Sequence, residues 1–383
     1  CLIFNKKNFL DKLKYFLNEK NILLSSLGRS ALYDIAKLII SKTNKKTFII
    51  APYTIPAVIH AIRHAGGKIA YVDIDKKTGL VNIEKLNKII NSDTAGVIIT
   101  HLYSKNEDIQ KFINSFNQKI FIIEDAAINF GAKSENKFLG TLGDFGFFSF
   151  AMVKNLNTFV GGAIYIKDNK LYKEFLENRS LKKFPFIRTL QLLITALIIK
   201  LFFNNYSYQI THYILKFVYK RKINSILKKI YPVLFHKYEE KIPEIYNYDF
   251  NWAMNDVAIF QLKTINNKIK ERCRKAKIYY EEINNEVCHK PKCFDGENAL
   301  LEYPIILNNK DNFELHKKLM HLGYDIRHTW YINNSRNISN NDYENYSDTL
   351  IVEKKIFCLP IHENIKDHDI KKISKIINNL CKI

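Results

Sequence analysis

The stretch FIIEDAAINFGAKSENKFLGTLGDFGFFSFAMVKNLNTFVGG, residues 121–162, decides the fold of this chain. Its first apolar run, FII, leads to the acidic pair Glu124 and Asp125, and a second run, FGFFSF, leads to Ser149 and then Lys154. Two buried strands that each end in polar groups are typical of open α/β sheets, which bind ligands at the carboxyl ends of their strands. The stretch therefore predicts a sheet with a ligand site at one edge.

Short apolar runs alternate with helical patterns throughout residues 1–166. The expected strands, rich in β-branched and aromatic residues, are TFIIAP, KIAYVDI, AGVIITHL, KIFIIEDA, FGFFSF and GGAIYI. The expected helices between them are ALYDIAKLIISK, PAVIHAIRHAGG and IEKLNKIINS. This alternation predicts an α/β domain with a doubly wound, mostly parallel sheet.

A second pattern begins near residue 246 and continues to residue 383. It predicts a long helix, a strand (EYPIIL), a helix (NFELHKKLMHLG), a strand (FCLPIH) and a last helix. We interpret residues 246–383 as a smaller α+β domain. The intervening residues 167–245 are apolar and basic and are expected to form helices.

A carboxylate and an amine at one sheet edge suit pyridoxal 5′-phosphate (PLP), which needs a lysine for a Schiff base and an acid to keep its ring nitrogen protonated. The chain also resembles the DegT/StrS family of sugar aminotransferases in the order and spacing of its motifs. These motifs are Glu124-Asp125-Ala126-Ala127, Gly131-Ala132, Gly140-Thr141-Leu142-Gly143-Asp144, Ser149-Phe150, Lys154 and Gly161-Gly162. The resemblance implies fold type I: a seven-stranded, mostly parallel sheet flanked by helices, and a smaller C-terminal domain.

The resemblance assigns roles to the two reactive side chains. Lys154 corresponds to the lysine that binds the cofactor aldehyde and moves the proton. Asp125 corresponds to the aspartate that pairs with the pyridinium nitrogen, although a helix N-cap is the plain structural alternative. Strand alternation points Glu124 to the opposite face.

Phosphate binding is expected at the start of the first helix. The turn Gly28-Arg29-Ser30 resembles the family's phosphate-binding turn, and backbone amides at a helix N-terminus favour an anion. Ser149 matches a family serine that also contacts the phosphate. Asn251 matches, in part, an asparagine that reaches the phosphate of the neighbouring subunit, which implies a homodimer with shared active sites.

Other cofactor and substrate positions depart from the family pattern. Ile128 stands where the family has a hydrogen-bonding residue beside the cofactor's phenolic oxygen, and Ile55 where an aromatic side chain often stacks on the ring. In the C-terminal domain, Arg327, His328 and His362 lie in segments that resemble the substrate-facing parts of the family. An ordinary surface or core role is the alternative for these three.

The segment from residue 184 to 203, FPFIRTLQLLITALIIKLFF, is the most apolar part of the chain. A bilayer-spanning helix needs about 20 mostly apolar residues, so we do not expect it to cross a membrane. Two interpretations remain open: helices buried in a subunit contact, or a peripheral membrane contact in which nearby lysines and arginines meet anionic head groups.

The amino-acid composition restricts the remaining classes of function, partner and cellular location. The net charge of +21 is carried by lysines spread along the chain, so we expect compositional bias and no nucleic-acid partner. Six scattered cysteines indicate a reducing cytoplasm, and Cys288 and Cys293 have no second pair at zinc-site spacing, so no metal is expected. No signal-peptide pattern is evident, and we expect a cytoplasmic enzyme, or one held at the inner face of the membrane.

These observations favour one function and leave alternatives. The resemblance implies that an amino acid such as glutamate donates nitrogen, through the cofactor, to a keto-sugar carried on a nucleotide, for surface polysaccharide or glycoconjugate synthesis. A sugar dehydratase of the same family is one alternative, although such relatives carry histidine in place of Lys154. A catalytically weakened, membrane-associated scaffold or binding protein is another. A dinucleotide-dependent dehydrogenase is disfavoured because no G-x-G-x-x-G follows the first strand.

Overall fold

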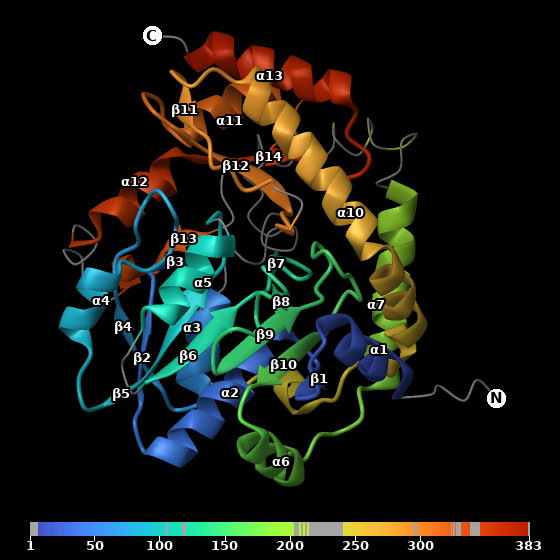
Figure 1. The fold of residues 1–383 in the computed structure, drawn as a ribbon. Coiled ribbons are helices and arrows are strands. Elements are labelled where there is room, and N and C mark those ends of the chain that lie inside the picture. Colours follow the sequence, from blue (N-terminus) through green and yellow to red (C-terminus); the bar gives the residue numbers. More distant parts are fainter. Residues whose placement is uncertain are drawn as a thin grey trace.

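The computed structural model describes residues 7–104, 106–116, 120–202, 207, 210, 213, 240–294, 297–322, 324, 326, 331–337 and 345–381. They form a large lobe and a small lobe, joined by one long helix (Figure 1). The large lobe is built around a seven-stranded sheet, and the small lobe around a three-stranded sheet.

The large sheet has the order β1-β10-β9-β6-β5-β2-β4. Its strands are β1 (Ile22–Ser25), β2 (Thr47–Ile50), β4 (Lys68–Tyr71), β5 (Thr94–Thr100), β6 (Phe121–Asp125), β9 (Phe145–Ser149) and β10 (Gly162–Ile166). The pairs between β4, β2, β5, β6 and β9 are parallel, whereas β10 is antiparallel to both of its neighbours. The predicted mostly parallel α/β sheet is confirmed.

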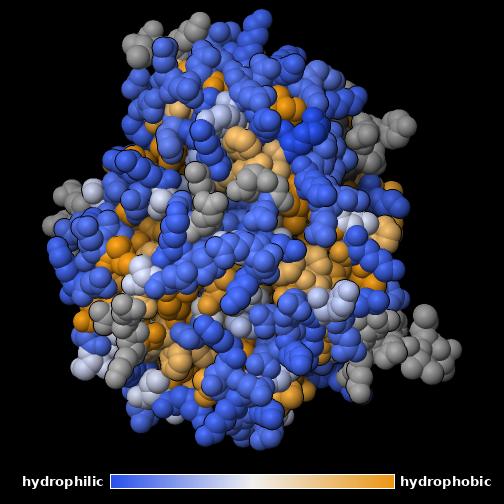
Figure 2. Space-filling view, in the orientation of Figure 1, coloured by the Kyte–Doolittle hydropathy of each residue, from blue (hydrophilic) through white to orange (hydrophobic). Residues whose placement is uncertain are grey.

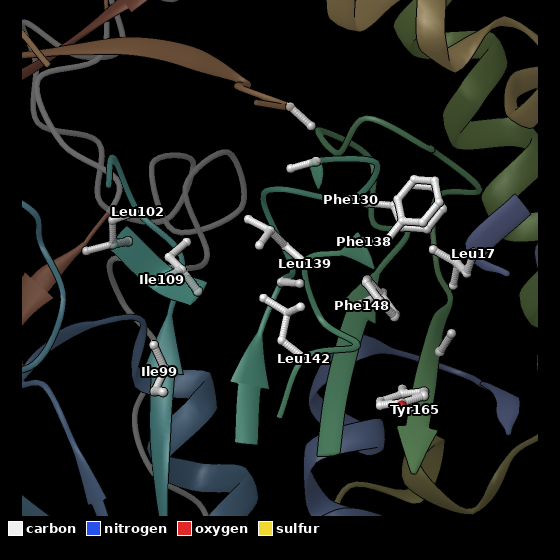
Figure 3. Packing of buried hydrophobic residues seen from close by; sticks show 14 of the residues in the cluster. Leu17, Ile99, Leu102, Ile109, Phe130, Phe138, Leu139, Leu142, Phe148 and Tyr165 are labelled. Carbon is white, nitrogen blue, oxygen red and sulfur yellow. The ribbon is translucent and has the colours of Figure 1, made fainter. Parts of the chain in front are cut away.

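Helices cover both faces of this sheet (Figure 1). The helices of this lobe are α1 (Lys7–Leu17), α2 (Gly28–Thr43), α3 (Pro56–His64), α4 (Ile83–Ile89), α5 (Asn106–Asn114) and α6 (Asn169–Asn178). Strand β5 is buried on both faces: Val97 and Ile99 belong to one hydrophobic cluster, and Ala95 and Ile98 belong to the other. Figure 3 shows Ile99 on the first side, with aromatic side chains from neighbouring strands and loops.

The small lobe is an antiparallel sheet with helices on it. Its strands are β11 (Cys288–His289), β12 (Glu302–Leu307) and β14 (Ile356–Pro360), and its helices are α11 (Asn312–His321), α12 (Ser347–Lys355) and α13 (Asp367–Cys381). The predicted small α+β lobe is therefore present. Short elements complete the structure: β3 (Tyr53–Thr54), β7 (Lys133–Ser134), β8 (Lys137–Phe138), β13 (Ile332–Asn333), and the 3-10 helices η2 (Glu244–Asn247), η3 (Trp252–Met254) and η4 (Asn334–Asn337).

Helix α10 (Asn255–Glu282) belongs to both lobes. Ala258 and Leu262, in its first half, pack into a core of the large lobe, whereas Ala276 and Tyr279, in its second half, pack into the core of the small lobe. One rigid helix therefore sets the relation between the two lobes. The domain boundaries expected from the sequence, at residues 166 and 245, stay predictions.

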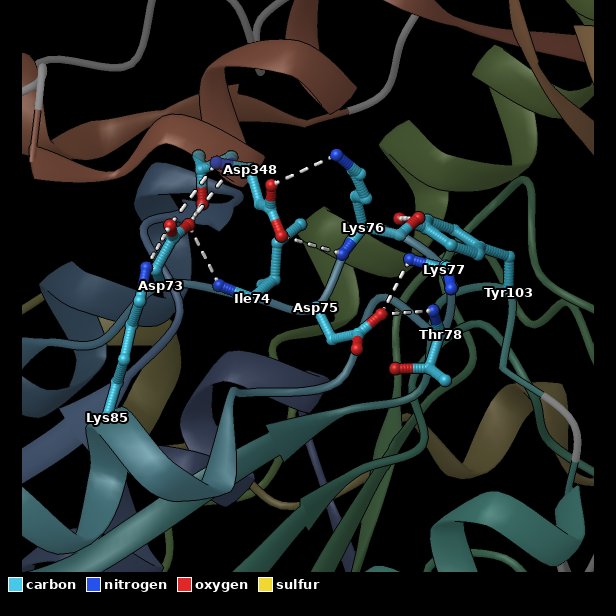
Figure 4. Close-up of polar contacts among 10 residues, drawn as sticks. Asp73, Ile74, Asp75, Lys76, Lys77, Thr78, Lys85, Tyr103 and Asp348 are labelled. Carbon is cyan, nitrogen blue, oxygen red and sulfur yellow. Dashed lines mark hydrogen bonds and ion pairs between the residues drawn. The ribbon is translucent and has the colours of Figure 1, made fainter.

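Strand β4 ends at Tyr71, earlier than the predicted strand KIAYVDI, because Asp73 is used differently. Its carboxylate accepts hydrogen bonds from the backbone N–H of Thr349 at 3.0 Å and of Asp348 at 3.2 Å, and from the Thr349 hydroxyl at 2.8 Å. It also pairs with Lys85 at 2.9 Å (Figure 4). A carboxylate of the large lobe thus caps the start of α12, in the small lobe.

Replacing Asp73 with alanine should weaken the attachment of α12. The change leaves the first amides of the helix and the Thr349 hydroxyl without their acceptor, which we expect to cost about 2–3 kcal/mol of unfolding free energy. Asp75 in the same loop bonds only local turn amides, those of Lys77 and Thr78, so Asp75→Ala should cost about 1 kcal/mol or less. Urea unfolding of both variants measures the difference, and equal losses would contradict the capping role.

Part of the apolar segment expected from the sequence is helix α7 (Phe186–Phe202). Most of its large side chains are exposed, and Figure 2 shows apolar side chains on the part of the surface where Figure 1 places this helix. Within the residue ranges given above, no helix combines the length and apolarity needed to cross a membrane.

Candidate active site

A cavity of about 340 Å³ lies at the carboxyl ends of β6 and β9, between the two lobes. From the large lobe it is lined by Leu27, Gly28, Arg29, Tyr53, Ile55, Ala57, Val58, Leu102, Tyr103, Asp125, Ala127, Ile128, Asn129, Phe147, Ser149, Ala151, Val153 and Lys154. We call its other side the small-lobe wall: Leu300, Leu301, Glu302, Pro304, Tyr331, Ile356 and Cys358. This is the position at which open α/β sheets bind ligands.

Asp125 is the last residue of β6 and is buried. Its carboxylate accepts a hydrogen bond from the backbone N–H of Ala127 at 3.1 Å. Burial raises the pKa of Asp125, and this increase is opposed by that hydrogen bond and by the nearby Lys154 and His101. The ionised form of a carboxylate in this position is stabilised when a ligand brings a positive charge next to it.

Lys154 lies five residues after the end of β9 and lines the cavity. It belongs to a turn in which its backbone N–H donates a hydrogen bond to the Ala151 carbonyl at 3.0 Å. Burial lowers the pKa of its amine to about 8, although Asp125 and Glu302 act in the opposite direction. At neutral pH a useful fraction of this amine is therefore unprotonated and nucleophilic. The two side chains singled out in the sequence line one cavity and affect each other electrostatically.

Glu124 lies on the other side of β6, as strand alternation predicts, and is fully buried. Its carboxylate accepts hydrogen bonds from the backbone N–H groups of Gly140 at 2.8 Å, Leu142 at 2.6 Å and Gly143 at 2.7 Å. His101 Nε2 lies 3.1 Å from its Oε2. Glu124 therefore fixes the loop before β9 from behind the cavity, a role that the sequence alone did not indicate.

The phosphate-binding end predicted from the sequence lies at the start of α2. Gly28, Arg29 and Ser149 line the cavity there. A Cβ on Gly28 would lie 2.8 Å from the Cβ of Ser149, so glycine is required for this close approach of α2 to β9. The Ser30 hydroxyl, in contrast, is buried among Ser25, Ser26 and Leu27, where it holds the turn, and its side chain does not line the cavity.

Ile55 and Ile128 line the cavity, and the aromatic side chains near them come from two lobes. The ring centroids of Tyr53 and Tyr331 are 5.5 Å apart, at an angle of 49°. Tyr331 is held there because β13 pairs with β3 and because the Asn334 amide donates to the Thr54 carbonyl at 2.6 Å. Burial, with Asp125, Cys358 and Glu302 nearby, raises the pKa of Tyr331 well above its ordinary value.

Like Ser30, the predicted site residues Asn251 and His362 are described but are not among the residues that line this cavity. Asn251 is buried away from the cavity, and its side-chain oxygen accepts hydrogen bonds from the Ala253 N–H and the Thr189 hydroxyl. His362 is exposed, and its carbonyl accepts a hydrogen bond from the Lys275 amine. Arg327 and His328 lie outside the described residues. From the same C-terminal segments, Tyr331 and Cys358 line the cavity, and the substrate roles expected for Arg327, His328 and His362 stay predictions.

Comparisons with known proteins concern the family and the fold of the chain. A model of the DegT/DnrJ/EryC1/StrS aminotransferase family matches residues 5–186. The chain is 29% identical to GDP-perosamine synthase of Escherichia coli O157:H7 over 179 residues, which make up 45% of this chain and 49% of that protein. The chain thus spans about half the length of this curated relative.

Two solved structures share the fold over nearly the whole chain. Helicobacter pylori PseC, an aminotransferase involved in the biosynthesis of pseudoaminic acid, has a TM-score of 0.70 at 17% identity, covering 98% of this chain and 91% of that one. GDP-4-keto-6-deoxymannose-3-dehydratase with a trapped PLP-glutamate geminal diamine has a TM-score of 0.71 at 18% identity, covering 97% and 92%. At such identities these likenesses concern the fold alone.

Proposed function

Because the chain belongs to the DegT/DnrJ/EryC1/StrS aminotransferase family, whose members bind PLP, we propose that it is a PLP-dependent sugar aminotransferase. Its substrates are an amino-acid donor, glutamate in the first instance, and a nucleotide-linked keto-sugar for polysaccharide or glycoconjugate synthesis. The observation that carries the proposal is the cavity in which Lys154, with its lowered pKa, lies with Asp125.

The residues of the cavity fit this cofactor. The N-terminus of α2, with Gly28, Arg29 and Ser149, offers backbone amides, a guanidinium and a hydroxyl to a phosphate. Asp125 offers a buried carboxylate to a protonated ring nitrogen, and Lys154 offers an amine to an aldehyde. When bound, PLP supplies that aldehyde and an electron-accepting ring.

Each chain residue then has a defined task. Asp125 would hold the proton of the ring nitrogen, and the neutral Lys154 amine would move a proton at the substrate carbon. Ile55 and Ile128 line the cavity and would offer the ring dispersion contacts, because neither side chain can donate a hydrogen bond to its phenolic oxygen. The small-lobe wall covers one side of the cavity and would limit the access of water to these groups.

The direct test adds PLP to the purified full chain and records the visible absorption of the bound cofactor. Glutamate should then remove the visible band, and a 4-keto-sugar nucleotide should restore it while gaining an amino group, detected by mass spectrometry. A band that glutamate leaves unchanged would favour the scaffold alternative, which Ile55 and Ile128 motivate. Loss of a sugar hydroxyl without gain of nitrogen would favour the dehydratase.

The pH dependence of cofactor attachment should follow the Lys154 amine. Because its pKa is lowered to about 8, the attachment rate should rise between pH 6 and 9 and then level off, with about a hundredfold difference between pH 6 and the plateau. Glu302 raises this pKa, so Glu302→Gln should move the midpoint to lower pH. Stopped-flow absorbance at each pH measures both curves.

Glu297→Gln, an exposed neighbour that does not line the cavity, is the matched control and should leave the midpoint unchanged. A wild-type midpoint near pH 10 would contradict the lowered pKa of Lys154. The same midpoint in Glu302→Gln as in wild type would contradict the influence of Glu302.

The resemblance also motivates a homodimeric form with shared sites, which we include in the proposal. Asn251, whose amide nitrogen has no hydrogen-bond partner among the described groups, is the residue assigned to this contact by its motif. The mass of the purified protein in solution, measured by light scattering with and without PLP, tests the oligomeric state.

A further inference from the structure

Helix α7 carries an apolar stripe on its outer side. Leu190, Leu193, Ile194, Leu197 and Ile198 follow the spacing of one helical face, and each is between 45% and 57% exposed. In a helix that packs on a protein core, this stripe faces inward. Here it faces solvent, whereas Thr189, on the inner side, is buried and donates a hydrogen bond to Asn251 at 3.2 Å.

Along the sequence, the charge around this stripe has one sign, although Arg188 in α7 pairs with the more distant Glu244 at 3.0 Å. Between Glu177 and Glu239 the sequence contains no Asp or Glu, although Asp and Glu number 38 in the 383 residues of the chain. The same interval contains twelve Lys and Arg, more than half of the formal net charge of +21. Lys182 and Lys183, directly before α7, are exposed. The apolar stripe therefore lies within a strongly basic part of the chain.

We infer that this outer face of α7 docks the protein on a membrane surface rich in anionic lipid. An apolar stripe next to basic side chains matches the boundary between acyl chains and negatively charged head groups. A 17-residue helix is about 26 Å long, shorter than the hydrocarbon core of about 30 Å, so α7 lies in the interface and does not span. The inference is independent of the proposed chemistry.

A second copy of the chain is the competing occupant, and the charge disfavours it. Two copies meeting through α7 would bring two acid-free, basic segments together, and like charges at close range repel. An anionic bilayer supplies the opposite charge. A contiguous exposed apolar surface of this kind marks an interaction site in either case, and the basic surroundings select the lipid.

The test is flotation of the full chain with vesicles of phosphatidylcholine alone or with 30% phosphatidylglycerol added. We expect binding to the anionic vesicles and at least tenfold weaker binding to the neutral ones, with a further decrease at high salt. Leu193→Glu with Leu197→Glu should abolish binding. Leu176→Glu with Leu322→Glu, equally exposed but away from α7, should not change it.

Basic side chains are tested in the same assay. Lys182→Glu with Lys183→Glu should weaken binding at least about tenfold, since each basic residue at the surface contributes about fivefold. Lys88→Glu with Lys111→Glu, which make the same change of charge elsewhere, should weaken it far less. All four double variants change exposed side chains, so their thermal unfolding midpoints should remain close to that of wild type.

Three results would overturn the inference. The first is no binding of wild type to anionic vesicles. The second is binding that the α7 variants and their controls change equally. The third is a combination of two findings: wild type does not bind vesicles, and light scattering shows a wild-type dimer that the double variant Leu193→Glu with Leu197→Glu dissociates. This face of α7 would then be an interface between two copies of the chain.

Discussion

Lys154→Ala is expected to lower the rate of amino transfer at least about a thousandfold. The change removes the amine that attaches the cofactor and that moves the proton, and the described residues lining the cavity include no other lysine. Visible absorbance after addition of PLP should be lost together with turnover. Both quantities are measured on the full chain with glutamate and a keto-sugar nucleotide.

Lys167→Ala is the matched control for this experiment. Lys167 follows β10 and is exposed, so its removal should leave absorbance and rate close to wild type. Lys154→Arg is a second variant, which keeps the charge but cannot attach the aldehyde, and it should fail like alanine. A Lys154→Ala protein with the wild-type visible band would show that the site lies elsewhere.

Glu124→Ala is expected to destabilise the large lobe by about 3–5 kcal/mol. The substitution leaves three buried backbone N–H groups, those of Gly140, Leu142 and Gly143, without an acceptor and removes the partner of His101. Glu124→Gln keeps one acceptor oxygen and should lose less. Urea unfolding followed by circular dichroism gives the order of the three proteins.

The control for Glu124 is Glu177→Ala, on the exposed side of α6, which should stay within about 0.5 kcal/mol of wild type. A second consequence is local. Because Glu124 and Asp125 are neighbours on β6, a loosened Glu124 should also weaken PLP binding. If Glu124→Ala unfolds at the same urea concentration as Glu177→Ala, the buried carboxylate does not hold the loop.

Local sequence patterns predicted the main part of the fold. The runs KIFIIEDA and FGFFSF became β6 and β9, since apolar runs of this length form strands buried on both faces. Strand β1, with only ILLS, was not predicted because its position depends on antiparallel pairing with β10, far along the chain. The early end of β4 also depends on a distant partner, Thr349.

The residues of the candidate site also fall into those that local sequence patterns predict and those that depend on distant pairing. Asp125 ends a strand and Lys154 follows one, and both strands carry a clear local signal. Alternation along β6 also distinguishes Asp125 from Glu124 by sequence alone. Glu302 and Tyr331 carry no such signal. They reach the cavity through the β12–β14 pairing and the β13–β3 pairing, which join residues far apart in the sequence.

This division has an evolutionary consequence. Gly28, Asp125 and Lys154 lie within residues 5–186, which the family model matches, whereas the small-lobe wall begins at residue 300. The wall is attached to the large lobe by helix α10, by the Asp73 cap on α12 and by backbone pairing of β13 with β3. The proposed cofactor residues and the wall therefore lie in separate stretches of sequence, so substitutions in one stretch can accumulate while the other stays unchanged.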